Sequence, residues 1–341
     1  MYKKSHFQFR KIVYGLLLLG FLVFLVGAGN LASVHAQDGG VLIKNPAILK
    51  LPQTPGDVPV DFGKIDPHNG TTLVGTTVTM DWEKDGNFSD LFYLHCVDKT
   101  NNGICDANIY WSDNDTNRTL TNLDAGSTYY WQAWACRPLY GCRGANYGEW
   151  WSFKVPPKVV TSIGTQDGWV LESSQGSHVG NSFNSTDTTF ILGDNTQNRQ
   201  YRGILSFDTS SIPNTAVIQS AVLRIHYSGA KSGTNPFTIL GPLYVDIRYG
   251  NFGSSANLQA SDFQAAADAT KVASFGTTPV SSWYSATLNS LGRAYINKTS
   301  LTQFRLYFNK ATNANNVADY MKFVSGDGSS KPQLVITYTV P

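Results

Sequence analysis

Residues 201–227, which read YRGILSFDTSSIPNTAVIQSAVLRIHY, decide the fold of the larger half of the chain. The stretch begins with a short apolar strand that ends at Phe207 and Asp208. It closes on a strict alternation, in which Ala221, Leu223, Ile225 and Tyr227 point one way and Val222, Arg224 and His226 the other. Between them Asp, Ser and Pro residues supply a turn, and Pro213 cannot donate to a sheet ladder. The stretch therefore predicts two strands joined by a fixed corner, the second of them half-buried.

The same region resembles a known family. In chain order, the elements that carry the likeness are the turn Gly193-Asp194, RGILSFD at 202–208, SSIP at 210–213, AVLRI at 221–225 and the closing KPQLVITY at 331–338. This order is similar to the secreted β-sandwich domains of the DNRLRE type, also called disaggregatase-related, which include carbohydrate-binding module family 96. The similarity begins at about Gly168 and covers roughly half of the chain. The resemblance implies a sandwich that binds polysaccharide, although its motifs are strand signatures and not a catalytic signature.

Length and composition favour two ordered β domains. The chain has 341 residues, 15% charged and 13% aromatic, with 31 glycines, which is typical of turn-rich β proteins. The formal net charge is +2, but four basic residues lie before position 12. Without them the charge is about −2 and no basic tract remains, so we expect no nucleic-acid partner.

The first 36 residues read as a signal peptide. Basic residues precede an apolar run at 12–26, and Val34-His35-Ala36 places small residues where a signal peptidase needs them. We expect cleavage after Ala36. The alternative is an uncleaved anchor, which would be the chain's only contact with a membrane. Either way the remaining chain is secreted or displayed at the cell surface.

Residues 37–56 are expected to be a proline-rich linker, and residues 57–156 a first domain. Residues 77–82 alternate, with Val78, Met80 and Trp82 on one face, and this domain resembles a fibronectin type III module. By that resemblance Trp82 is the core tryptophan. Leu123, Gly126 and Tyr129 are then the corner in which a tyrosine hydroxyl bonds back to upstream backbone. Such a module is a spacer or a docking surface.

All four cysteines lie in this first domain. Four cysteines allow three pairings, and the favoured one joins Cys96 to Cys105 and Cys136 to Cys142, because each pair brackets a loop with turn residues. A zinc site of four thiolates is the alternative. An exported protein and the spacing of the pairs favour disulfide bonds.

After the boundary at Pro156-Pro157, residues 159–341 carry many short strands with turn signals and predict a jelly-roll-like β-sandwich. The fold class is thus all-β, with two sandwiches. Two short helical pieces are expected as well. One begins at an N-cap Ser261 before the alanines 265–267, and the other places Leu288, Leu291 and Tyr295 on one face.

A search for catalytic chemistry finds little. The chain has no nucleophile elbow, zinc-protease motif, phosphate loop or dinucleotide fingerprint, so we expect no enzyme and no cofactor. Glycoside cleavage needs two facing carboxylates, and after the leader the glutamates are Glu83, Glu149 and Glu172. An undetected aspartate pair is the remaining enzymatic alternative.

Two stretches have a partial calcium-loop pattern. Residues 98–103 begin like an EF-type loop, but Ile109 stands where the bidentate acid belongs. Residues 113–124 end in Asp124 but have Arg118 at the glycine position. Turns rich in Asn and Asp explain both stretches more simply, so we expect no metal.

Sugar binding by a sandwich needs exposed aromatic faces together with fixed polar groups. The ligand-binding candidates are Trp283, Tyr284, Tyr249 and Arg248, and Trp169, Phe252 and Arg202 are weaker ones. Core packing is the alternative role for each aromatic residue. Trp283 and Tyr284 lead because adjacent residues of a strand face opposite ways, so one of the two is expected outside.

The sequence thus indicates an exported, non-catalytic protein that binds polysaccharide or cell-envelope glycan, including acidic glycan, through its C-terminal sandwich. The alternative is a structural or adhesive cell-surface protein with a protein partner and no sugar site. The oligomeric state stays open.

Overall fold

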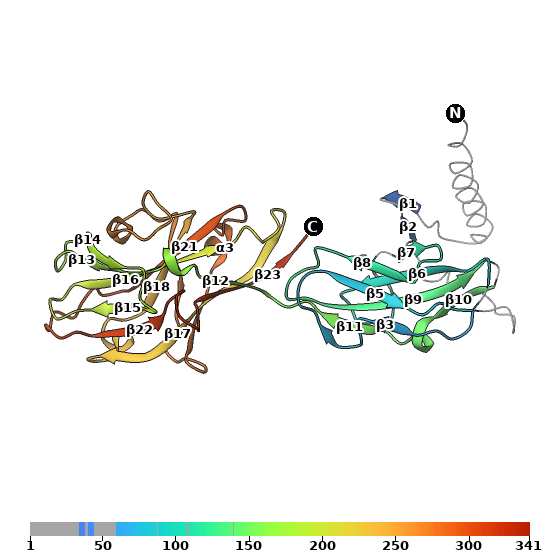
Figure 1. Cartoon of the computed structure of the whole chain (residues 1–341), viewed down its shortest axis with the longest axis horizontal. Helices are drawn as coiled ribbons and strands as arrows, with labels where there is room; N and C mark the ends of the chain where they lie inside the picture. Colours follow the sequence, from blue (N-terminus) through green and yellow to red (C-terminus); the bar gives the residue numbers. More distant parts are fainter. Residues whose placement is uncertain (1–33, 38–39, 44–58, 87, 108, 139) are drawn as a thin grey trace, which may run out of the picture. The chain divides into compact units, whose positions relative to one another are not determined.

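The computed structural model describes residues 34–37, 40–43, 59–86, 88–107, 109–138 and 140–341, and strands dominate it (Figure 1). Most of the expected signal peptide, residues 1–36, and of the expected linker, residues 37–56, lies outside these residues. From that part only the hairpin of β1 (Val34–Gln37) and β2 (Gly40–Ile43) is described. Within the described part, no helix combines the length and the apolar character that a bilayer span needs.

The chain folds into two compact units. One gathers the described residues up to Asn69 with Met80–Arg118 and Tyr129–Ser152, and the other gathers Gly70–Thr79, Thr119–Thr128 and Phe153–Pro341. Both are built from packed β-sheets, which confirms the all-β class with two sandwiches.

Besides the β1–β2 hairpin, two sheets lie in the described part of the chain before residue 155. The smaller has three strands in the order β3 (Lys64–Asp66), β5 (Val78–Trp82), β8 (Asn117–Leu120). The larger runs in the order β4 (Thr71–Thr72), β11 (Trp151–Lys154), β9 (Thr128–Arg137), β6 (Phe92–Asp98), β7 (Ile109–Ser112), with β10 (Gly141–Gly144) paired to β9. Strand β5 buries alternate residues, as its sequence predicts, and Trp82 packs on Tyr93 with ring centroids 5.9 Å apart.

A lysine is buried in this core. Lys64 is 5% exposed, and its Nζ donates to Oε1 of Gln132 at 3.0 Å and to the backbone carbonyl of Glu149. The ammonium also lies 5.6 Å from the ring centroid of Trp131 and 5.2 Å from that of Trp151. Burial lowers the pKa of Lys64 to about 7, and the negative charge of Glu149 offsets only part of this effect.

From β12 (Lys158–Thr161) onward, the strands of the second unit form one long sheet that curls on itself. Its strand order is β12, β23 (Gln333–Thr339), β17 (Val217–Ser232), β22 (Tyr320–Val324), β15 (Thr189–Asp194), β16 (Gln200–Asp208), β21 (Leu301–Phe308), β18 (Leu243–Tyr249), β19 (Ala269–Ser274). Three further strands pair beside this path: β20 (Trp283–Thr287) with β17, and β13 (Gly168–Glu172) with both β14 (Gly180–Asn184) and β16.

Strand β17 makes the curl possible because it changes partners along its length. Residues 217–226 pair with β23 and β20. From Tyr227 to Ser232 the strand pairs with β22 instead, and the register shifts between Tyr227 and Lys231. The alternation predicted for this strand is confirmed, since Ala221, Leu223 and Ile225 are fully buried. They join one core that also contains residues of β15, β16, β18, β20, β21, β22 and β23.

The helical expectations need correction. Only a 3-10 turn, η4 (Ala260–Phe263), forms near Ser261, and its N-cap is Gln259. The alanines 265–267 do not continue it. The second piece, α3 (Ser290–Ala294), is capped by Asn289, so Leu288 lies before the helix. Leu291 is 50% exposed, and the expected apolar face of Leu288, Leu291 and Tyr295 does not form. Helices α2 (Pro236–Ile239) and α3 are each about one turn long, because strand ladders already satisfy most of the backbone.

Replacing Leu223 by alanine is expected to lower the free energy of unfolding of the second unit by about 3 kcal/mol, because the cavity would lie at the centre of a closed core. Urea unfolding measures the change. Val222→Ala, on the half-buried side of the same strand, is the control and should lose less than about 1.5 kcal/mol. Equal losses would contradict the assignment of the two sides.

Lys64 predicts a pH dependence in the first unit. Its folded pKa, about 7, is below the ordinary lysine pKa of 10.5, so between these values the unfolded state binds more protons and stability rises with pH. In Lys64→Met this rise should disappear, so the stability of the wild type relative to the variant should increase from pH 7 to pH 10. Chemical denaturation at pH 6, 8 and 10 tests it, and parallel pH curves for the two proteins would contradict it.

Candidate functional site

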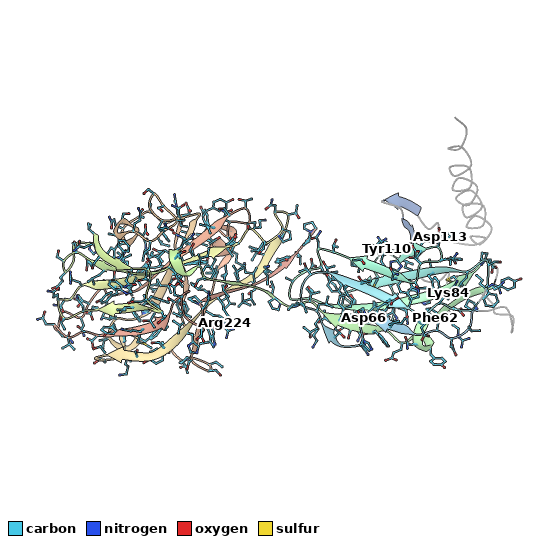
Figure 2. The ribbon with its side chains drawn as sticks, in the orientation of Figure 1. Phe62, Asp66, Lys84, Tyr110, Asp113 and Arg224 are labelled. Carbon is cyan, nitrogen blue, oxygen red and sulfur yellow. A yellow bond between two sulfur atoms is a disulfide. The ribbon has the colours of Figure 1, made fainter. Side chains whose placement is uncertain are left out.

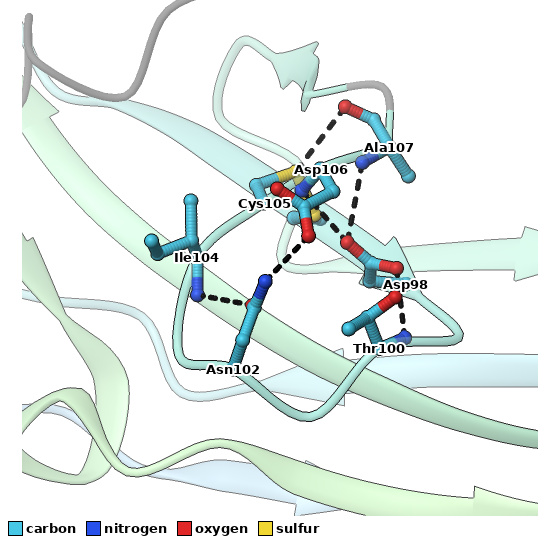
Figure 3. Close-up of a disulfide and its surroundings, with 8 residues drawn as sticks. Asp98, Thr100, Asn102, Ile104, Cys105, Asp106 and Ala107 are labelled. Carbon is cyan, nitrogen blue, oxygen red and sulfur yellow. Dashed lines mark hydrogen bonds between the residues drawn. A yellow bond between two sulfur atoms is a disulfide. The ribbon is translucent and has the colours of Figure 1, made fainter.

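The disulfide loop with the partial calcium pattern is closed by its own hydrogen bonds (Figure 3). Oδ1 of Asp98 accepts the Thr100 N–H, and Oδ2 accepts the N–H groups of Asp106 and Ala107. Oδ1 of Asn102 accepts the Ile104 N–H. These oxygens therefore shape the turn. Across the described ranges, no three His, Cys, Asp or Glu side chains gather as metal ligands.

The structure has two disulfide bonds, Cys96–Cys105 and Cys136–Cys142, which is the sequence-local pairing. Both border a small apolar cluster on one side of the larger N-terminal sheet.

The sequence candidates do not come together as one site. Trp283 and Tyr284 are on β20, which pairs only with β17, whereas Arg248 and Tyr249 are on β18, between β21 and β19. Arg248 is already paired, since its Nη1 lies 2.8 Å from Oδ1 of Asp268. Tyr249 is 50% exposed at the end of its strand.

Tyr284 is removed from the candidates. It is 5% exposed, stacks on Phe237 at 5.2 Å and meets Phe323 edge-on at 5.7 Å. Its parity on β20 points it into the core, so Trp283 is the outward member of the pair. Of the weaker candidates, Phe252 is fully buried and Trp169 is partly buried against the core.

A cationic and aromatic surface does form on the outer side of β16, β21 and β18. We call it the tyrosine face; its members are Arg202, Tyr244, Lys271 and Tyr307. Tyr244 lies opposite Tyr307 in the strand register, with Arg202 Cζ 5.1 Å from the Tyr307 ring and Lys271 Nζ 4.6 Å from the Tyr244 ring. The tyrosines point outward because their strand neighbours, Leu243, Val245, Leu306 and Phe308, belong to the core.

Arg202 is held rigidly by neutral acceptors and forms no direct ion pair. Its Nε donates to Oε1 of Gln200 at 2.8 Å, its Nη1 donates to the carbonyl of Phe263 at 2.7 Å, and its guanidinium lies over the Phe263 ring at 4.0 Å. Burial, and then the charge of Arg305, lower the pKa of Arg202 to about 10, and the nearby Tyr307, Asp246 and Glu172 offset part of this effect. The guanidinium therefore stays charged at pH 7. Among the described residues, no carboxylate lies within 4.0 Å of it.

Arg305, in contrast, is a paired charge. Its Nη2 lies 2.8 Å from Oδ2 of Asp246, with side chains only 7% and 2% exposed. The Tyr307 hydroxyl donates to Oδ1 of the same carboxylate at 3.1 Å. Burial, reinforced by Asp246, raises the pKa of Tyr307 to about 12, so this phenol stays protonated.

The loop after β18 packs against part of this side of the sheet. Nη1 of Arg305 donates to the carbonyls of Asp262, Phe263 and Ala265, which fastens the loop to β21. A second apolar cluster lies beneath it and comprises Val170, Ile204, Phe252, Leu258 and Phe263. Within the tyrosine face, Arg202 contacts this loop through Phe263.

Trp283 lies in a second cationic and aromatic group, on β17 and β20. We call Arg224, His226 and Trp283 the tryptophan face. His226 is opposite Trp283 in the register and meets it edge-on at 5.0 Å, and Arg224 Cζ is 4.7 Å from the indole ring. Figure 2 labels Arg224 among the side chains of this unit.

The tyrosine face could have been sought in the sequence from the alternation of its strands, together with their basic and aromatic residues. Residues 303–308 alternate, and Arg305 and Tyr307 share the side of β21 that leaves the core. Arg202 has the same position on β16. A basic residue and an aromatic residue on the outer parity of neighbouring strands would have indicated the site.

No family model and no curated protein matches the chain. Solved structures similar to it include an α-L-rhamnosidase from Dictyoglumus thermophilum, at 10% identity and a TM-score of 0.23 over 82% of this chain and 28% of that one. Chitinase ChiA74 from Bacillus thuringiensis has 8% identity and a TM-score of 0.21, over 76% and 28%. The surface glycan-binding protein PbSGBP-B from Prevotella bryantii has 10% identity and a TM-score of 0.18, over 88% and 81%. The chain spans about a quarter of the first two, and similarity at this level carries no argument about function.

Asp246→Ala should destabilise the second unit by about 3–5 kcal/mol, because it leaves the buried Arg305 charge and the Tyr307 hydroxyl without their acceptor. Urea unfolding monitored by tryptophan fluorescence measures it. The control is Asp268→Ala, which removes the more exposed Arg248 pair and should cost about 1 kcal/mol. The reverse order of the two losses would contradict this account of the face.

Proposed function

We propose that this is an exported, non-catalytic protein whose C-terminal sandwich binds polysaccharide with carboxylate groups at the tyrosine face. The observation that carries the proposal is Arg202, a mostly buried guanidinium that is fixed by neutral acceptors and has no carboxylate within 4.0 Å among the described residues. A buried charge is unfavourable unless it is paired. A ligand carboxylate would supply the missing counterion, bidentately if it meets the guanidinium fork.

The width of the face favours a polymer over a small anion. Arg202, Tyr307 and Tyr244 lie on three adjacent strands, which are about 4.8 Å apart, and Lys271 extends the row toward β19. A single carboxylate cannot reach both cations at the ends of such a row. Successive sugars of an extended acidic chain can, while tyrosine rings offer apolar surface to pyranose faces.

Three further observations support this function. The chain resembles DNRLRE-type domains and carbohydrate-binding module family 96, which implies glycan binding for the second sandwich. Two disulfide bonds suit an oxidising compartment outside the cytoplasm. The first sandwich, with its fibronectin type III-like pattern, would act as the spacer that presents the second.

The test is binding of polygalacturonate and of neutral cellohexaose to the full chain by calorimetry. Binding of the acidic glycan should weaken with salt, since the charges are at the surface. Arg202→Gln should weaken it about tenfold, which is about 1.4 kcal/mol. Tyr249→Ala, an exposed tyrosine outside the face, and Lys84→Ala, an exposed cation in the first unit (Figure 2), are the controls and should leave the affinity unchanged.

A flat result across acidic and neutral glycans would overturn the proposal. It would favour the other reading, a structural or adhesive surface protein with a protein partner. Binding that Arg202→Gln leaves intact would keep the class of ligand but move the site elsewhere.

A further inference from the structure

We propose that the tryptophan face is a second site for carboxylated polysaccharide, so that one C-terminal sandwich bridges two polymer chains. The inference rests on the proposed function for its ligand class, but on separate residues for its site.

The two faces point away from each other across one core. On β17, Arg224 and His226 alternate with Leu223 and Ile225, which are fully buried. On β21, Tyr307 likewise stands between Leu306 and Phe308, which line the same core. Since residues of alternate parity leave a sheet on opposite sides, the two outer faces lie on opposite sides of the sandwich. A polymer chain on one face therefore does not compete with a chain on the other.

The tryptophan face repeats the chemistry of the tyrosine face. A guanidinium lies on an aromatic ring in both, Arg202 over Tyr307 and Arg224 over Trp283. Arg224 has one neutral hydrogen-bond acceptor, Oε1 of Gln333 at 3.3 Å, and within the described residues no carboxylate lies within 4.0 Å of it.

A straight polar row accompanies these cations. Arg224 is opposite Gln333 on one side and Ser285 on the other, and Gln333 is in turn opposite Thr161. The row crosses four antiparallel strands, about 14 Å in all, and contains no acidic residue. Its amide and hydroxyl groups match the hydroxyls of an extended sugar chain, and its positive charge matches a carboxylate.

The occupant we commit to is a second acidic polysaccharide chain, on the grounds of charge complementarity. Two sites of the same specificity on opposite sides make the domain bivalent. Long polymers would then be held with a higher apparent affinity than short oligomers, because the second attachment is intramolecular.

Titration calorimetry of the full chain with tetragalacturonate tests the number of sites. Two oligomers per chain are expected. The pair Arg224→Gln and Trp283→Ala should remove one of them and leave the other with unchanged affinity, and Arg202→Gln should weaken the other about tenfold. A wild-type stoichiometry of one, or of two that the tryptophan-face variants leave unchanged, would overturn the inference.

Light scattering with long polygalacturonate tests bridging itself. The wild type should raise the scattering near equivalence and lose it at excess protein, when each polymer chain is saturated. A variant of either face should bind the polymer without this rise, and Lys84→Ala should behave as the wild type. Scattering by a tryptophan-face variant at the wild-type level would contradict bridging.

The two proposals fail in different ways. If the wild type does not bind tetragalacturonate at all, the proposed function fails. If it binds one oligomer, which Arg202→Gln weakens, the proposed function holds and the second site is rejected. Circular dichroism and thermal unfolding of each variant, matched to the wild type, ensure that a lost site is not a lost fold.

Discussion

Burial of one side of strand β17 is the constraint on which the second unit depends. Residues 221–225 of the strand present one apolar side to the core. Along its length the strand pairs first with β20 and β23 and then with β22. Because Leu223 and Ile225 face residues contributed by both ends of the sheet, the sheet has to curl around them. A one-residue slip would place Arg224 in the core and Leu223 outside, so the register is strongly specified.

This curl also decides where function can reside. Every strand that sends an apolar residue inward sends its neighbour outward, and the outward residues on β16, β21 and β17 include arginines beside aromatic rings. The sheet thus holds long cationic side chains with little freedom, since they lie flat on rings that the core fixes. Fixed guanidinium groups lose less conformational entropy when a ligand binds.

The sequence predicted the class of fold well because that class follows from alternation, which is local. The buried residues of β17 could be assigned one by one from their period. The choice between Trp283 and Tyr284 was also available, because Tyr284 shares its parity with Ala286, which is apolar and buried. The tyrosine face could not be assembled in this way, since register across β16, β21 and β18 brings together residues that are far apart in the chain. The alanines 265–267 misled for a related reason: tertiary hydrogen bonds from Arg305 to the carbonyls of Asp262, Phe263 and Ala265 hold the loop in a single turn.

The contrast between satisfied and unsatisfied polar groups separates structural residues from candidate binding residues. The sequence pattern around Asp98 resembles part of a calcium loop. In the structure its oxygens accept three backbone N–H groups, and these hydrogen bonds close the loop. Asp246 is equally committed, to Arg305, Tyr307 and the Lys271 N–H. Arg202 and Arg224 differ, because neutral oxygens orient them and neither forms a direct ion pair with a described carboxylate. A charge that the fold positions but does not pair directly can be stabilised further by a ligand of opposite charge. For two such charges on opposite sides of the curled sheet, an acidic polymer is the partner that their spacing and sign fit best.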